Sequence, residues 1–403
     1  MLSVERKQEL IAFCQAAIRC KSLSGQEGEI AALLSAMMKK KNFNSVSVDR
    51  YGNVVGQIIL GKGGQKLLME GHMDHVDVSD PSKWHFDPYG AEIADDKIYG
   101  RGTSDMKGNL CAMLLAAAYV REDKGSELNG EVLVAGSVHE ECFEGVASEE
   151  IGKNWKPDKV IIGEASNLTV KRGQRGRAEV VAETFGKTAH SSTPAVGVNA
   201  VKKMARLIDT LDQTFQPATH PVLGEGILEV TDIISSPYPG ASVIPEHCRA
   251  TFDRRLLVGE TVGSVLAPLQ SFLEHLSTQD GDFKAQVSLA RGAETCYTGE
   301  SISAERFAPG WLFEAEHPFV QEVLSGLRSV GQDPHLSHYY FCTNGSYYAG
   351  KAGIPTIGYG GSLETLAHVV DEYIEIEQLL KACEGYYGII SSCASQTENR
   401  SRM

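Results

Sequence analysis

Seven acidic residues and histidines with the character of metal ligands recur along this chain. They follow apolar stretches or lie in glycine-rich turns, which is where an α/β enzyme carries its chemistry. Together they supply two imidazoles and several carboxylates, a ligand set that suits a pair of Zn²⁺ ions, or Mn²⁺ or Co²⁺. The seven residues are His72, Asp74, Asp105, Glu140, Glu141, Glu164 and His368.

The spacing of apolar residues predicts the elements that position these side chains. Two helices are expected over residues 4–20 and 26–41, and a buried helix over residues 110–118. Strand-like runs are expected at residues 45–49, 54–60, 66–71, 131–138 and 158–163. Strands that alternate with helices in this way favour a sheet covered by helices on both faces.

The pattern changes near residue 176. Residues 176–290 read as strand, helix, two strands, helix and strand, which is the ferredoxin-like order. The candidate ligands all lie outside this segment, and α/β character returns after residue 291. The predicted fold class is α/β: a metal-binding domain of residues 1–175 and 291–403, with a mixed sheet covered by helices, interrupted by an inserted α+β domain of residues 176–290.

The composition bounds the function classes. With 403 residues the chain is too long for one ordinary core, and a net charge of −14 without a Lys/Arg-rich block argues against a nucleic-acid partner. Nine cysteines without a C-x-x-C pair fit reduced thiols. With no apolar run that could span a bilayer, we expect a cytoplasmic protein with no membrane partner. The polar end, residues 395–403, is expected to be a frayed tail.

Four motifs together resemble the M20 metallopeptidase family, which includes glutamate carboxypeptidase, acetylornithine deacetylase, succinyl-diaminopimelate desuccinylase and aminoacylase. They are EGHMD at 70–74, YGRGTSDMKG at 99–108, Glu140-Glu141, and GKTAHSSTP at 186–194. The likeness covers nearly the whole chain, with the motifs in family order. Residues 172–177 (RGQRGR) and 253–256 (DRRL) resemble the YgeY-like hydrolases more closely.

The resemblance implies a dinuclear metal site. Asp105 would bridge the two metals, because a shared anion offsets the repulsion between two nearby cations. His72 and Glu164 would complete one site, and Glu141 and His368 the other. The resemblance also implies a cis peptide bond between Asp105 and Met106.

Taken singly, each candidate ligand has a simpler explanation. A lone His72 is more often structural, and adjacent glutamates are more often a solvated surface pair. Glu164 could cap a helix, and His368 could be a surface histidine. Because so many coincidences in the family order are improbable together, the combined set favours the metal site.

Two further acids would support the metals. Glu140 would be the general base, which takes a proton from a metal-bridging water and delivers it to the leaving amine. Asp74 follows His72 by two residues, so on a strand both side chains would point the same way. Its carboxylate would then accept the imidazole N–H and fix the tautomer.

Residues for substrate recognition are also implied by the resemblance. His190 would reach the active site of a partner subunit and stabilise the oxyanion, which implies a homodimer formed through residues 176–290. The simpler explanation of His190 is a loop histidine. Arg255 would grip a substrate carboxylate, while Arg254 would point away on the strand. Asn344 and Gly345 would contact the substrate backbone, with plain turn chemistry as the alternative.

One residue departs from the family pattern. Many relatives have an acidic or neutral residue immediately before the two glutamates, whereas this chain has His139. This substitution changes the charge beside the metals.

The sequence therefore predicts a metal-dependent hydrolase of an amide or peptide bond in a small carboxylate-bearing substrate, such as an N-acyl amino acid or a dipeptide. One alternative is an N-carbamoyl amino acid amidohydrolase on the same scaffold. Another is a non-catalytic small-molecule binding protein, against which the intact set of ligands and Glu140 argues. The sequence specifies neither the acyl group nor the metal.

Overall fold

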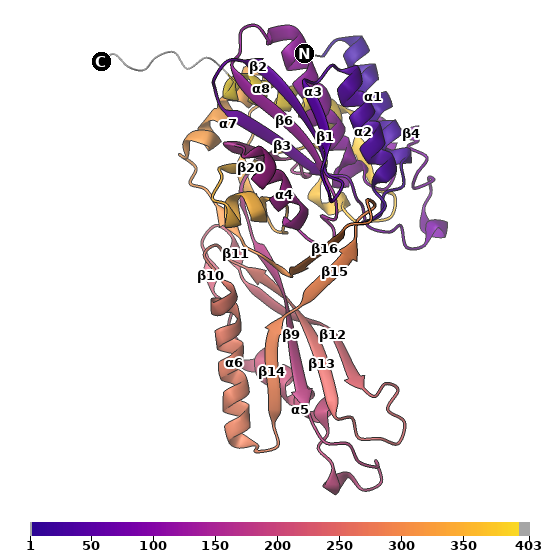
Figure 1. The fold of residues 1–403 in the computed structure, drawn as a ribbon, viewed down its shortest axis with the longest axis vertical. Coiled ribbons are helices and arrows are strands. Elements are labelled where there is room, and N and C mark those ends of the chain that lie inside the picture. The colour runs from indigo at the N-terminus through magenta and orange to yellow at the C-terminus, as the bar shows by residue number, and fades with distance from the viewer. Residues whose placement is uncertain (1, 395–403) are drawn as a thin grey trace, which may run out of the picture. The chain divides into compact units, whose positions relative to one another are not determined.

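The computed structural model describes residues 2–394, so the tail expected at residues 395–403 lies outside the described residues. The chain folds as two compact units (Figure 1). Unit 1 comprises the chain up to Gln174, Ala293–Ser303 and the chain from Leu312 onward; unit 2 comprises Arg175–Gly292 and Ala304–Trp311. The chain therefore passes between the units four times, whereas the sequence suggested two passages, near residues 175 and 291.

Unit 1 is built on a nine-stranded mixed sheet, in agreement with the predicted fold class. Four neighbouring strands, β6, β3, β7 and β20, run parallel, while β2 and β8 pair with this group in the antiparallel sense. Across the sheet the order is β1 (Ser45–Val48), β2 (Val54–Gly61), β6 (Gly130–Ser137), β3 (Lys66–His72), β7 (Lys159–Ile162), β20 (Thr356–Gly358), β8 (Val170–Gln174) and β18 (Trp311–Leu312), with β19 (Leu336–Tyr339) beside β8.

Helices cover both faces of this sheet. On one face α4 packs Ile151 against Leu68. On the other face α3 lies so close to β3 that a Cβ on Gly71 would be 3.1 Å from the Met113 methyl carbon. Every residue of α3 from 108 to 120 is buried, as expected for a helix enclosed on all sides. The helices are α1 (Val4–Arg19), α2 (Gly28–Lys40), α3 (Gly108–Lys124), α4 (Val146–Trp155), α7 (Pro318–Ser329) and α8 (Ile376–Cys393).

Smaller elements complete unit 1. A three-stranded sheet has the order β21 (Tyr373–Glu375), β5 (Lys97–Tyr99) and β4 (Ile93–Ala94). Short helical turns lie at Pro81–Lys83, Thr103–Lys107, Ser346–Lys351 and Glu364–Leu366. Among the described residues of both units, no helix has the length and apolar character needed to cross a membrane.

Unit 2 has the predicted ferredoxin-like order. Its elements are β9 (Gly176–Phe185), α5 (Ala200–Thr214), β12 (Ile227–Ser236), β13 (His247–Leu256), α6 (Val262–Gln279) and β14 (Lys284–Leu289), with a short turn at Pro194–Val196. The strands form an antiparallel sheet in the order β12-β13-β9-β14, to which β17 (Phe307–Ala308) adds beside β9. A separate pair, β10 (Thr219–His220) and β11 (Gly224–Glu225), completes the unit.

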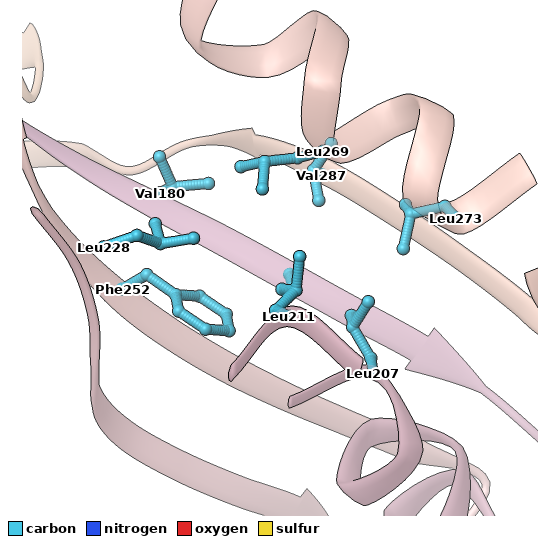
Figure 2. Close-up of a pocket in the computed structure, with 9 residues that line it drawn as sticks. Val180, Leu207, Leu211, Leu228, Phe252, Leu269, Leu273 and Val287 are labelled. Atoms are coloured by element: carbon cyan, nitrogen blue, oxygen red, sulfur yellow. The ribbon is translucent and has the colours of Figure 1, made fainter. Parts of the chain in front are cut away.

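Apolar side chains form the core cluster of unit 2. Figure 2 shows Leu207 and Leu211 of α5 and Leu269 and Leu273 of α6 facing side chains from all four long strands. They enclose a gap of about 10 Å³, which offers no polar partner to a water molecule. This core therefore holds unit 2 together without the residues of the candidate metal site.

A hairpin that the sequence did not predict links the two units along the chain. It consists of β15 (Arg291–Thr295) and β16 (Ser301–Glu305), and its tip belongs to unit 1. The Tyr297 hydroxyl donates to the Gly52 carbonyl at 2.9 Å, and the Thr298 hydroxyl donates to the Arg50 carbonyl at 2.7 Å. A Cβ on Gly52 would lie 2.2 Å from the Tyr297 ring, so glycine is required for this contact.

We therefore expect Gly52→Ala to destabilise the protein. The new Cβ overlaps the Tyr297 ring, and Gly52 also has a φ of 102°, which L side chains rarely adopt. Overpacking and backbone strain together predict a loss of about 2–4 kcal/mol. Thermal unfolding measures it, with Gly63→Ala as the control, because Gly63 has a φ of 73° but nothing within 4 Å of its added Cβ. Equal losses in the two variants would show that the Tyr297 contact contributes nothing.

Candidate metal centre

The candidate ligands of unit 1 gather where its parallel strands end. His72 is the last residue of β3, Glu140 and Glu141 follow β6, and Glu164 follows β7. These three strands are neighbours and parallel, so their carboxyl ends meet at one edge of the sheet. The turn at Thr103–Lys107 brings Asp105 to the same edge.

Asp105 lies between two groups of ligand atoms. Its Oδ1 is 2.9 Å from His72 Nε2, which in turn is 3.4 Å from Glu164 Oε1. Its Oδ2 is 3.1 Å from His368 Nε2, which is 3.0 Å from Glu141 Oε2. The two oxygens of one carboxylate thus serve two separate groups, each with one imidazole and one further carboxylate.

These spacings fit metal coordination. Ligands of a tetrahedral zinc ion with bonds of about 2.0–2.1 Å lie about 3.3 Å from one another. The four distances above bracket that value. Glu141 Oε1 is buried and has no hydrogen-bond partner among the described residues, as expected for an oxygen that serves a cation. The donor set of imidazole nitrogens and carboxylate oxygens suits two divalent ions.

The electrostatics of this edge also favour cations. Burial, followed by the charge of Asp105, raises the pKa of Glu141 to about 7. Burial likewise raises the pKa of Glu140 well above its ordinary value. Burial opposes ionisation of Asp105, but hydrogen bonds from His368 and His72 outweigh it and lower its pKa. The hydrogen bonds that His368 donates to Asp105 and Glu141 raise the pKa of His368 to about 10. Positive charge is therefore what this group of carboxylates requires.

Two oxygens of Asp74 face the Nδ1 atom of His72, and the backbone carbonyl oxygen is the nearer. β3 ends at His72, so Asp74 no longer lies on the strand. The imidazole Nδ1 is 2.9 Å from the Asp74 backbone carbonyl and 3.6 Å from its carboxylate. Because a carbonyl only accepts, Nδ1 carries a proton, and Nε2 is the nitrogen that would bind a metal.

The Asp74 carboxylate also orients the two glutamates. Its Oδ1 accepts the Glu140 amide at 3.1 Å, and its Oδ2 accepts the Glu141 amide at 3.2 Å and the Ser24 hydroxyl at 2.7 Å. Asp74 is fully buried. Asp74 thus contacts the backbone of the glutamate pair in addition to the His72 imidazole.

Glu372, which the sequence reasoning did not single out, holds the Asp105 turn. Its Oε1 accepts the amides of Ser104 and Asp105 at 2.8 and 3.0 Å. Its Oε2 accepts from Arg101 at 2.7 Å, in an ion pair that is almost completely buried. Glu372 lies only four residues beyond His368, so it connects the segments of two candidate ligands. The Asp105–Met106 peptide bond is cis, as predicted.

Asn344 and Gly345, for which the resemblance implies substrate contacts, make hydrogen bonds within the protein. The Asn344 side-chain amide donates to Glu70 at 2.8 Å and to Ser137 at 2.9 Å, and its oxygen accepts the Gly145 amide at 2.7 Å. The Gly345 amide donates to the hydroxyl of the preceding threonine at 3.0 Å. Both residues therefore hold a loop, and the Asn344 side chain is buried.

The remaining predicted residues belong to unit 2. His190 is exposed, and its Nδ1 accepts the Ser192 amide at 3.1 Å. Arg255 is half-buried on β13, where its Nε donates to Asp253 at 2.8 Å. Arg254 is buried on the opposite face of the strand and pairs with Glu260, as the alternation of strand side chains predicts.

Removing the acceptor capacity of Asp74 should weaken metal binding. In Asp74→Asn, one of the two oxygens becomes an N–H donor that faces the Glu140 or Glu141 amide. Losses of about 10–100-fold in affinity are typical when residues that support metal ligands are changed. Competition with a chromophoric chelator measures this affinity. Asp77→Asn, at an exposed site in the same loop, is the control, and equal affinities would contradict the assigned role.

Comparisons with known proteins agree with this geometry. The model of peptidase family M20/M25/M40 matches residues 68–392. The chain is 31% identical over 386 residues to the uncharacterised protein YgeY of Escherichia coli K12, covering 95% of this chain and 93% of that protein. It is 28% identical over 389 residues to succinyl-diaminopimelate desuccinylase 2 of a Ruegeria species, covering 93% and 92%.

A solved structure has the same fold. The YXEP protein of Bacillus subtilis, described as a dinuclear metal-binding peptidase of the M20 family, aligns with a TM-score of 0.71 at 13% identity, over 97% of this chain and all of that one. The family model spans the candidate ligands from His72 to His368. With ligands, fold and sequence in agreement, the chain belongs to the M20/M25/M40 peptidase family.

Proposed function

We propose that this protein hydrolyses an amide or peptide bond in a small substrate with a free carboxylate, such as an N-acyl amino acid or a dipeptide. The observation that carries the proposal is Asp105, whose two oxygens lie 2.9 and 3.1 Å from imidazoles of two separate ligand groups. A relative named as a desuccinylase, 28% identical over nearly its whole length, supports this class of reaction.

Two divalent cations are proposed as cofactors, with Zn²⁺ favoured and Mn²⁺ or Co²⁺ as alternatives. His72 and Glu164 would hold one ion, Glu141 and His368 the other, and Asp105 both. A solved structure described as a dinuclear metal-binding peptidase supports the number of ions. Bound ions would acidify a water molecule and polarise the carbonyl of the scissile bond.

Glu140 is proposed as the general base. Its carboxylate and the ligand atoms of His72 and Glu164 lie within 4.8 Å of one another, and its side chain is 7% exposed. Burial raises its pKa, which brings its basicity closer to that needed near neutral pH. The carboxylate would take a proton from the attacking water and deliver it to the nitrogen of the leaving amine. The adjacent Glu141 is directed to His368 instead, so the two glutamates do not compete.

Unit 2 would recognise the substrate. The Arg255 guanidinium is oriented by the hydrogen bond from its Nε to Asp253, and 29% of the Arg255 side chain is exposed. Arg255 is therefore proposed to bind the substrate carboxylate. Because His190 Nδ1 accepts the Ser192 amide, the ring proton lies on Nε2, which can then donate to a developing oxyanion. His190 is proposed to act in a partner subunit of a homodimer formed through residues 176–290. The protein is also proposed to act in the cytoplasm.

A substrate panel separates the alternatives. N-acyl amino acids, N-carbamoyl amino acids and dipeptides should be tested with Zn²⁺, Mn²⁺ and Co²⁺, each substrate beside its C-terminal carboxamide. Turnover of the free acids with little turnover of the carboxamides would support the proposed class. Turnover of N-carbamoyl compounds alone would favour the carbamoyl hydrolase, and metal binding without any turnover would favour a binding protein.

Glu140→Gln should abolish turnover while the fold and the bound metal remain. The amide is nearly isosteric but cannot accept the proton from water, so a loss of about 10²–10⁴-fold in kcat is expected. Steady-state kinetics and metal analysis of the same preparation measure both quantities. Glu149→Gln, at a partly exposed position of α4 where the side chain pairs with Lys153, is the matched control. Near-normal kcat at full metal content would remove Glu140 from the mechanism.

Subunit mixing tests the proposed role of His190. His190→Ala and Glu140→Gln homodimers should each be inactive, and exchange between them should restore part of the activity. If His190 acts across the interface, some mixed dimers contain one site in which both groups are intact. Native mass spectrometry confirms exchange. Activity that stays absent after confirmed exchange would mean that His190 acts within its own subunit or not at all.

A further inference from the structure

Glu27 is a buried acid with no metal-binding or catalytic role in the proposal above. It immediately precedes α2, and its side chain is fully buried. Its Oε1 accepts the amide of His139 at 3.2 Å and the amide of Gly25 at 2.9 Å. Glu27 therefore contacts the residue immediately before the proposed base, across 112 positions of the chain.

Three consecutive backbone amides lead into the metal centre, and each is bound by a buried carboxylate. The His139 amide donates to Glu27, and the next two amides donate to the two oxygens of Asp74 at 3.1 and 3.2 Å. His139 also has a φ of 56°, in the left-handed region that non-glycine residues rarely adopt. Such a conformation persists only where the surroundings impose it, and the Glu27 acceptor at the His139 amide is one of these contacts.

The hairpin tip packs closely against the segment that carries Glu27. A Cβ on Gly25 would lie 2.7 Å from the Thr295 carbonyl oxygen and 3.5 Å from the His139 ring, so three segments of the chain meet there. A Cβ on Gly28, next to Glu27, would lie 3.2 Å from the Tyr297 ring. Glu27 Oε2 is buried without a hydrogen-bond partner among the described residues. Glu27 is fully buried, and hydrogen bonds in the low-dielectric interior are stronger than in water.

We propose that Glu27 is a positioning residue for the general base, because its Oε1 fixes the His139 amide and thereby the direction of the Glu140 side chain. This inference rests on the proposed function only in naming Glu140 as the base. The position of the loop itself does not depend on the reaction.

The required property is a carbonyl oxygen at the correct reach, not a negative charge. Burial, followed by the charge of Asp74, raises the pKa of Glu27 to about 7. A protonated carboxyl still presents one oxygen that accepts both amides. Glutamine offers the same oxygen at the same distance, whereas aspartate keeps the charge but withdraws it by one methylene.

Glu27→Gln and Glu27→Asp therefore separate reach from charge. With the metal sites saturated, Glu27→Gln should retain kcat within about threefold, while Glu27→Asp should lower kcat tenfold or more with little change in KM. Glu9→Asp is the matched control, because Glu9 in α1 accepts from Lys41 and from Tyr119 of α3 and has no hydrogen bond to a candidate ligand or its neighbours. It should lower the melting temperature without lowering kcat.

Hydrogen exchange tests the positioning without any substrate. Peptides covering residues 138–143 should exchange faster in Glu27→Asp than in the wild type, and at wild-type rates in Glu27→Gln. If the wild type cleaves no amide, the proposed function fails, and hydrogen exchange alone decides on Glu27. Wild-type exchange rates in Glu27→Asp would overturn the inference. So would a Glu27→Gln variant that loses as much kcat as Glu27→Asp.

Discussion

The crowding of carboxylates at one edge of a parallel sheet is the constraint on which the rest of the structure depends. Three carboxylates lie 2.9–3.4 Å from the imidazoles of His72 and His368; they belong to Asp105, Glu141 and Glu164. Two like charges 4 Å apart repel by about 4 kcal/mol at a typical protein dielectric, so several of them require cations or protons nearby. Burial, with a smaller contribution from neighbouring carboxylates, raises the pKa values of Glu141 and Glu140. Divalent cations remove this repulsion, which couples metal binding to the stability of unit 1.

The ligands must also be held in place before a cation arrives, and the chain does this with further buried acids that accept backbone amides. Asp74 binds the amides of Glu140 and Glu141, and Glu372 binds the amide of Asp105. Carboxylates are suited to this task because each oxygen accepts more than one N–H, and such charge-assisted bonds are stronger than neutral ones. Each of these acids has donors of its own and so does not compete for the metal. Asp74, one of the seven candidates of the sequence analysis, belongs to this supporting group.

The sequence was sufficient for the features that depend on local periodicity. Alternation and helical spacing located the strands, the buried helix α3 and the ferredoxin-like order of unit 2, and the strand ends located His72 and Glu164. It was insufficient for features that depend on contacts between distant segments. Glu372 meets the Ser104 amide across 268 positions, and no local pattern distinguishes it from a surface acid. Asp74 was assigned to a strand that ends two residues earlier, and the hairpin of residues 291–305 depends on a glycine at position 52.

The distribution of residues between the two units has a consequence for how this protein can vary. All five candidate ligands and Glu140 belong to unit 1, whereas Arg255 and His190 belong to unit 2, which has its own apolar core. Substitutions at well-separated positions that share no partners usually act independently. Changes on β13 or in the His190 loop should therefore leave the carboxylates of unit 1 and the acids that orient them unchanged. The hairpin of residues 291–305 is the exception, because its strands continue into unit 2 and its tip lies against Gly25 and Gly52.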